Sequence, residues 1–155
     1  MLYQLGALTF SCPGPLGADE TEETFGHDFA VKPVVGAQQP RESMGPADHK
    51  FMLSGTLLPY FHARIGLGSG LGEVATLKSM ARGGQSYPLV RGDGVLIGAE
   101  EGGTGWWLIE RGSLKSSRLG SQGIGNVISY SMTLVESPNL PSSGSLIGLL
   151  EQLFA

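Results

Sequence analysis

Charge and cysteine are both scarce in this sequence of 155 residues. Charged residues make up 15 % of the chain, against about 25 % in an average globular domain. The formal net charge is −4 and the basic residues form no stripe, so a protein that binds the phosphates of nucleic acid is not indicated. The single cysteine, Cys12, has no partner for a disulfide within the chain.

Long hydrophobic runs are also missing. No apolar stretch approaches the ~20 residues that a membrane-spanning helix needs. The first residues, MLYQLGALTF, lack the basic start and the small-residue cleavage site of a signal peptide. We therefore expect a soluble chain that is not secreted by the standard route and has no membrane partner.

Glycine, in contrast, is abundant, with 25 residues, and apolar residues often alternate with polar ones. This period of two predicts strands over Phe51–Leu58 and Val127–Val135, with Met1–Phe10 as a further candidate. Apolar residues at helical spacing, with a stop at Gly83, predict one central helix over Glu73–Arg82. Strands do not alternate with helices. The sequence therefore predicts a mainly β fold, an antiparallel β-sandwich or barrel with one packed helix.

The region that follows the first strand gives weaker patterns. Glu20–Ala30 mixes charge with two phenylalanines and predicts no clear element. The valines of Val31–Val35, with a proline among them, predict a short extended segment at a sheet edge. Gly36–Lys50 is polar and rich in turn residues, so we expect a loop there.

The only two tryptophans, Trp106 and Trp107, are adjacent in the apolar run GWWLIE. Adjacent residues of a strand point to opposite faces of a sheet, so we expect one indole in the core and the other on the opposite face. The second indole is a candidate contact with a neighbouring subunit or with the helix Glu73–Arg82. The alternative is that both indoles belong to two sides of one thick core.

The end of the sequence carries a separate amphipathic pattern. Five large apolar residues follow helical spacing, and Ser145 is a suitable N-cap. They are Leu146, Leu149, Leu150, Leu153 and Phe154. We therefore divide the chain into a body over residues 1–136, a linker over 137–145 and a C-terminal helix over 146–155. The helix either folds back on its own domain or docks on a neighbouring chain.

Motifs for catalysis, cofactors and metals are not found. His27, His49 and His62 are far apart and lack metal-ligand spacing. The glycine-rich GLGSGLG has neither the lysine of a P-loop nor a GxSxG nucleophile. The RGD triplet, Arg91–Asp93, is followed by Gly94 and predicts a hairpin turn rather than an adhesion motif. The sequence thus predicts no catalytic, cofactor-binding or metal-binding residue, and a protein that is not an enzyme.

Six stretches of the sequence occur in a distinctive order and spacing. They are MLYQLGALTF, VVGAQQPRESMG, LSGTLLPY, a helix ending in MARGG, LVRGDGVLIG and WWLIE. Together they resemble the tail protein U family of contractile-tailed phages, over about Met1–Pro138. The chain departs from the family at AEEGGT, which lengthens a turn, and in the segment after Pro138, which resembles an added extension.

The resemblance implies a tail-tube-like fold and a structural role in the virion tail or baseplate, with assembly in the host cytoplasm. Subunits would join into a hexameric ring between the tail tube and the central hub of the baseplate, as a platform for tube assembly. The implied partners are other copies of the chain, the tail tube protein, and baseplate hub or LysM-like tail proteins. DNA or the tape-measure protein would be passing cargo only. Related particles such as R-type pyocins carry similar proteins.

Two alternatives stay open at this point. A tail terminator ring at the head-proximal end of the tube is the same kind of protein at another place. A carbohydrate-binding β-sandwich module is a different class, and would need exposed aromatic side chains that converge with polar ones in a groove.

Overall fold

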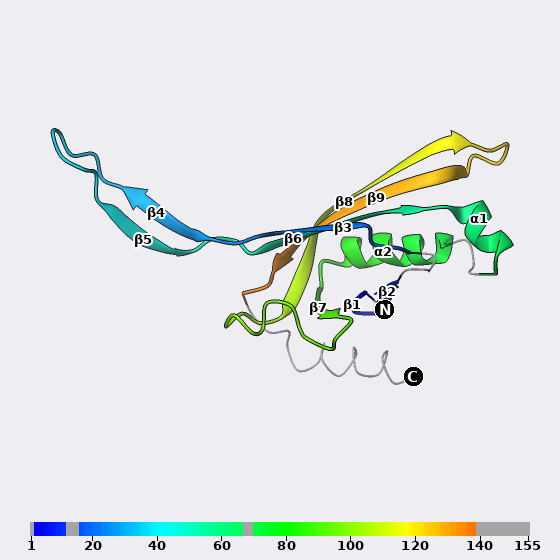
Figure 1. Ribbon diagram of the computed structural model, residues 1–155, viewed down its shortest axis with the longest axis horizontal. Helices are drawn as coiled ribbons and strands as arrows, with labels where there is room; N and C mark the ends of the chain where they lie inside the picture. The colour runs from blue at the N-terminus through cyan, green and yellow to red at the C-terminus, as the bar shows by residue number, and fades with distance from the viewer. Residues whose placement is uncertain (1, 12–15, 67–69, 139–155) are drawn as a thin grey trace.

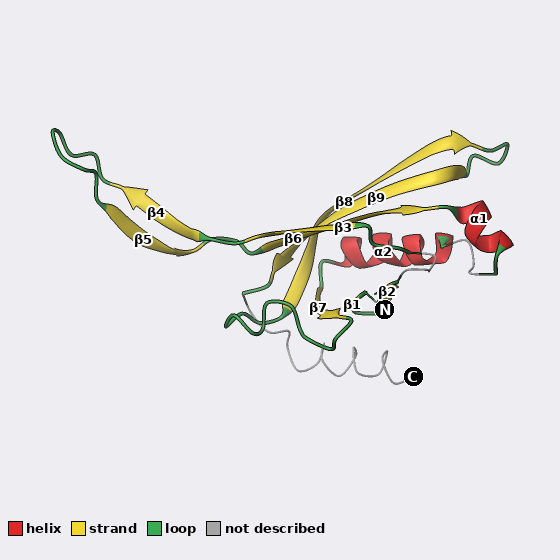
Figure 2. Ribbon diagram, in the orientation of Figure 1, coloured by secondary structure: helices red, strands yellow, loops and turns green. Residues whose placement is uncertain are grey.

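The structure, a computed structural model, describes residues 2–11, 16–66 and 70–138 (Figure 1). Its elements in chain order are β1 (Tyr3–Leu5), β2 (Leu8–Phe10), β3 (Glu20–Thr24), β4 (His27–Val31), β5 (Arg41–Pro46), β6 (Lys50–Leu57), α1 (Pro59–Arg64), α2 (Leu71–Gly83), β7 (Ser86–Arg91), β8 (Trp106–Leu119) and β9 (Gly125–Glu136). Strands outweigh helices throughout the described residues, so the prediction of a mainly β fold is confirmed (Figure 2).

Seven of the strands form one antiparallel sheet in the order β2-β1-β7-β8-β9-β6-β3. β9 lies inside this sheet, because it pairs with the whole of β6 on one side and with β8 on the other. The pairing with β8 runs from Trp107↔Glu136 to Leu119↔Gly125. β8 has 14 residues, which at ~3.3 Å each gives a strand roughly 45 Å long.

The sheet curves so that its two halves pack on each other. The ring of Tyr3 in β1 lies 5.7 Å from that of Phe51 in β6, and Phe10 in β2 lies 6.2 Å from Tyr130 in β9. This arrangement resembles a sandwich made from a single sheet. The buried cluster between the halves contains Leu5, Leu8, Phe10, Leu16, Phe51, Leu53, Leu77, Met80, Tyr87, Leu89, Trp107, Tyr130, Met132 and Leu134. Burial of each large apolar side chain contributes about 1.5–3 kcal/mol.

The helix α2 is the predicted central helix and packs against β8 and β2. It runs slightly beyond the predicted Glu73–Arg82 at both ends. Its buried side chains are Val74, Leu77 and Met80, at the helical spacing that places them on one face. The left-handed residue that ends it is Gly84, with φ of 66°, one position after the predicted stop.

Three elements differ from the sequence prediction. The candidate strand Met1–Phe10 is instead a hairpin of β1 and β2, in which Tyr3 pairs with Phe10 and the chain turns at Gly6 with φ of 56°. A short helix, α1, begins at Pro59, where only the end of a strand was predicted; proline suits the first turn of a helix because its missing N–H has no partner there anyway. The expected loop Gly36–Lys50 was wrong over β5, which pairs with β4 in a separate two-stranded sheet. Both strands are exposed on their two faces, so no alternation of apolar residues marks them.

The predicted turn at Asp93-Gly94 is present. The backbone N–H of Arg91 donates to the carbonyl of Val95 at 2.9 Å, and Gly94 has φ of 88°. The chain after the turn makes only one isolated bridge, Val90↔Leu96, and continues as a loop to Gly105.

Candidate interaction surface

The hairpin of β4 and β5 and its connection form an arm over residues 25–47 that projects from the sheet (Figure 1). No residue of this arm is buried. Six of its large apolar side chains are exposed: Phe25, Phe29, Val31, Val34, Val35 and Met44. A two-stranded hairpin alone is at best marginally stable in water, and grouped exposed apolar residues mark contact surfaces. The arm is therefore a candidate surface for another protein chain.

At the root of the arm, the imidazole of His49 lies between two carboxylates. Its Nδ1 is 2.7 Å from Oε2 of Glu136, and its Nε2 is 2.5 Å from Oε1 of Glu23. Ionised carboxylates only accept hydrogen bonds, so the doubly protonated, cationic ring is the form that satisfies both contacts. The three residues connect β3, the start of β6 and the end of β9.

Two aromatic rings make edge contacts with the imidazole of His49. The ring centroid of Trp107 lies 4.9 Å away at 63°, and that of Phe25 lies 6.4 Å away at 86°. Trp107 belongs to the core and Phe25 begins the arm. His49 therefore links the core directly to the base of the arm.

The environment of His49 favours its charged form. Burial lowers the pKa of His49, but the hydrogen bonds and negative charges of Glu23 and Glu136 outweigh burial, so the pKa is raised above its usual 6.5. The charged ring is thus stabilised relative to a free imidazole by the two acids that surround it.

The loop over residues 98–104 closes around the carboxylate of Glu136. The backbone N–H of Thr104 donates to its Oε1 at 2.8 Å. A Cβ at Gly103 would lie 1.7 Å from the same oxygen, and a Cβ at Gly98 would lie 2.8 Å from Oε2. No side chain fits at Gly103 without moving the carboxylate.

A groove of about 770 Å³ opens between this loop, His49 and the root of the arm. Its walls include the exposed acids Glu23, Asp48 and Glu101, and the exposed ring of Phe25. The groove is therefore acidic, and the positive charge of His49 at its base is already shared between two carboxylates.

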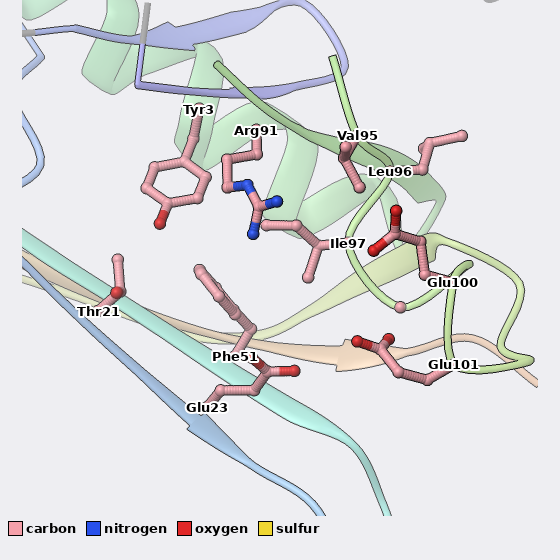
Figure 3. Close-up of a pocket in the computed structure, with 11 residues that line it drawn as sticks. Tyr3, Thr21, Glu23, Phe51, Arg91, Val95, Leu96, Ile97, Glu100 and Glu101 are labelled. Carbon is pink, nitrogen blue, oxygen red and sulfur yellow. The ribbon is translucent and has the colours of Figure 1, made fainter. Parts of the chain in front are cut away.

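A smaller cavity of about 240 Å³ adjoins the groove and shares Glu23 and Glu101 with it (Figure 3). Figure 3 shows the guanidinium of Arg91 in this cavity, with the side chains of Glu100 and Glu101 on the loop opposite. Arg91 is paired with Asp93 at 2.8 Å, so its charge is already balanced. Carboxylates thus dominate this side of the molecule.

The geometry of this site favours contact over catalysis. Both ring nitrogens of His49 are held by carboxylates, which leaves neither free to take a proton from a substrate. Over residues 2–11, 16–66 and 70–138, no group of three or more His, Cys, Asp or Glu side chains is arranged to hold a metal ion. Within the same residues, no helix combines the length and the apolar character needed to cross a membrane.

The two tryptophans lie as a strand pair should. Trp107 is fully buried and its Nε1–H donates to the carbonyl of Ile97 at 2.9 Å. Trp106 is partly exposed. The prediction that one indole enters the core is confirmed, whereas a contact of Trp106 with another subunit stays a prediction. The other predicted contact residues, Leu146, Leu149, Leu150, Leu153 and Phe154, lie outside the described residues, as does most of the predicted linker.

Sequence reasoning missed both the arm and the residues at its root. His49 is 26 positions from Glu23 and 87 from Glu136, so no local spacing connects them. The one available signal was the run AEEGGT, whose second glycine is the residue that the carboxylate of Glu136 requires.

The fold and this surface suit a structural protein, because the most exposed feature is an apolar arm and the histidine at the arm's root is fixed between carboxylates. The Phage P2 GpU family model matches residues 6–139, which is most of the chain. The protein belongs to this family and is a structural component of a phage tail. The resemblance in the sequence is thereby confirmed. The comparison with curated proteins gave no match.

Proposed function

We propose that this protein forms a hexameric ring between the tail tube and the central hub of the baseplate, and that the ring is the platform on which the tube begins. The arm over residues 25–47 carries this proposal. Within the described part of the chain, nothing covers its apolar side chains and nothing pairs with the outer edges of β4 and β5. A neighbouring subunit would bury the side chains and pair with a strand edge.

The ring contacts three kinds of partner in this proposal. Its copies contact one another, one face receives the tail tube protein, and the other face meets the baseplate hub or a LysM-like tail protein. DNA or the tape-measure protein passes through the lumen without being bound. A net charge of −4 per subunit supports this, since like charge disfavours contact with phosphate. The subunit performs no chemical step.

The decisive experiment is cryo-electron microscopy of intact particles, combined with native mass spectrometry of the purified protein. We expect a six-fold ring of this chain at the junction of tube and baseplate. Density at the head-proximal end of the tube would instead assign the tail terminator. A monomer that binds sugars and is missing from the particle would favour a carbohydrate-binding module.

The role of the arm is tested by a matched pair of variants. Phe29→Ser combined with Met44→Ser removes two exposed apolar side chains from the arm and should sharply reduce incorporation into particles without unfolding the body. Leu2→Ser combined with Met52→Ser removes two exposed apolar side chains elsewhere and should leave incorporation unchanged. Equal incorporation of both variants would contradict a role of the arm in assembly.

A further inference from the structure

The two ends of the molecule carry complementary surfaces. The groove end consists of the acidic groove and the arm. The tip end consists of residues 59–66 and 113–124, that is α1 and the tip of the β8–β9 hairpin. Figure 1 shows the arm and this tip at opposite extremes of the chain. The two parts of the tip end touch, since a Cβ at Gly120 would lie 3.1 Å from the hydroxyl of Tyr60.

The charges of the two ends are opposite in sign. The cavities of the groove end are lined by four exposed acids, Glu23, Asp48, Glu100 and Glu101. The tip end contains three exposed bases, Arg64, Lys115 and Arg118, and no acid. None of these bases forms an ion pair with the described residues.

Exposed apolar side chains are also concentrated at the groove end and the tip end. Besides the six on the arm, the tip end exposes four: Tyr60, Phe61, Ile65 and Leu119. Of the other exposed large hydrophobic residues in the described chain, Leu96 lines the smaller cavity of the groove end, and only Leu2 and Met52 lie elsewhere. Apolar contact surface is thus concentrated where the opposite charges lie, which favours docking of one end on the other.

The backbone at the tip adds an independent observation. Arg118 is the single described residue other than glycine with φ in the left-handed region, at 53°. This conformation costs energy for any residue with a Cβ, whereas glycine adopts it freely. Such backbone strain is found mainly at active sites, ligand contacts and switch regions. Leu119 beside it is 65 % exposed.

We infer that the tip end of one copy docks into the groove end of the next copy, with Lys115 and Arg118 facing Asp48 and Glu101 and with the arm covering the apolar side chains of the tip. This inference rests on the proposed ring. The groove adjoins the Trp107↔Glu136 pair at one end of β8. The tip is at the Leu119↔Gly125 pair, twelve residues further along the same strand, which is roughly 40 Å away. The contact therefore joins two chains. Such head-to-tail contacts close into rings when the rotation between copies permits.

Zero-length crosslinking of carboxylates to lysine amines tests this contact in intact particles. We expect crosslinks from Lys115 to Asp48 or Glu101. Lys115 is eight residues along β8 from the Trp107↔Glu136 pair beside the groove, roughly 26 Å, so a zero-length crosslink can form only between copies. The ion pairs Lys32–Glu42 and Lys50–Glu110 provide internal positive controls. Crosslinks of Lys115 only to other tail proteins would overturn the inference and leave the ring in place.

Charge reversal gives a second, independent readout in the purified protein and in particles. Asp48→Lys with Glu101→Lys, or Lys115→Glu with Arg118→Glu, should each weaken self-association tenfold or more, because like charges then face each other. An equal mixture of the two variants should assemble again, with the two chains alternating. The pair Lys78→Glu and Arg82→Glu makes the same charge change on exposed positions of α2 and should have no effect.

The outcomes separate this inference from the proposed function. If both groove and tip variants assemble as well as the unaltered chain, the docking is wrong while the ring stands. If each fails alone and their mixture also fails, the two ends contact different partners and the docking is again wrong. If the chain is missing from the tube–baseplate junction, the proposed function fails, and crosslinks formed by the concentrated purified protein still decide whether the ends meet.

Discussion

His49 and Glu136 are 87 positions apart in the sequence, yet the Nδ1 of one and the Oε2 of the other lie 2.7 Å apart. The contact joins the end of β9 to the residue that precedes β6, and Glu23 from β3 completes it on the other ring nitrogen. Three strands are therefore fixed relative to one another where the arm leaves the body. The cluster therefore holds together the strands from which the arm extends.

Glu136→Gln should lower the free energy of unfolding by about 1–3 kcal/mol, since it leaves one ring nitrogen of a partly buried cation without its charged acceptor. Urea denaturation measures the change. Glu110→Gln is the matched control, because Glu110 pairs with Lys50 at 3.6 Å on an exposed surface and its loss should change stability by less than about 0.5 kcal/mol. Equal effects of the two changes would show that the cluster adds nothing to stability.

The stability of the protein should depend on pH through His49. Its pKa is raised in the folded state, so its contribution is fully present below about 6.5 and is lost as the pH rises through the raised pKa. The groups that face it are Glu23 and Glu136, and Asp48 lines the same groove. Thermal unfolding measured from pH 6 upward should show the loss, and His49→Gln should remove it.

The control for this experiment is His27→Gln, which removes an imidazole that contacts Ser43 on the exposed arm. It should leave the pH dependence in place. If His27→Gln and His49→Gln flatten the profile equally, the cluster at the root is not its source.

Gly103→Ala should destabilise the protein by about 1–3 kcal/mol, because its Cβ would occupy the position of the Glu136 carboxylate. Gly112→Ala is a suitable control on β8, where the nearest atom to a new Cβ is the carbonyl oxygen of Ser131 at an ordinary 3.9 Å. Denaturation curves of the two variants provide the comparison. Unchanged stability of Gly103→Ala would mean that the loop over residues 98–104 moves aside freely.

The two tryptophans should respond differently to assembly. Trp107→Phe should cost about 1–3 kcal/mol of stability, because it leaves space in the core and an unpaired carbonyl at Ile97. In this variant Trp106 is the only tryptophan, and its emission should shift to shorter wavelength when subunits assemble. In Trp106→Phe the emission of the buried Trp107 should stay constant. An unchanged Trp106 signal on assembly would remove it from the interface.

The C-terminal pattern is tested by Leu149→Asp combined with Leu153→Asp. If the predicted helix over residues 146–155 docks on a neighbouring chain, the change should spare the thermal stability of the free subunit and weaken incorporation into particles. A loss of stability in a demonstrated monomer would mean that the helix belongs to its own domain.

The sequence predicts well those elements that have one buried face. Leu53 in β6, Met132 in β9 and Leu77 in α2 are buried, and the polar residues between them reveal the period of two or of 3.6. The arm lacks this information because both its faces are exposed. The sequence also predicts that one of the two adjacent indoles is buried, but the alternation of faces along a strand does not determine which one.

The site at the root of the arm depends on register between distant strands. Glu23, His49 and Glu136 meet only because β6 is paired with β3 on one side and with β9 on the other. No rule of local spacing reaches across such pairings, and no motif of known chemistry includes these residues. The family resemblance predicts the role of the protein in the tail, but not this cluster.

The position of β9 inside the sheet also limits when the sheet can fold during translation. About 70 residues separate the end of β6 from the start of β9, which at ~5–20 residues per second means several seconds of translation during which β6 lacks one of its two neighbours. β8 is made directly before β9, since it ends at Leu119 and β9 begins at Gly125. The sheet is completed in one late step, when β9 leaves the ribosome and enters between β6 and β8. Because Glu136 is the last residue of β9, the cluster at the root of the arm forms only then, and the root of the arm is fixed only once the body of the subunit is closed.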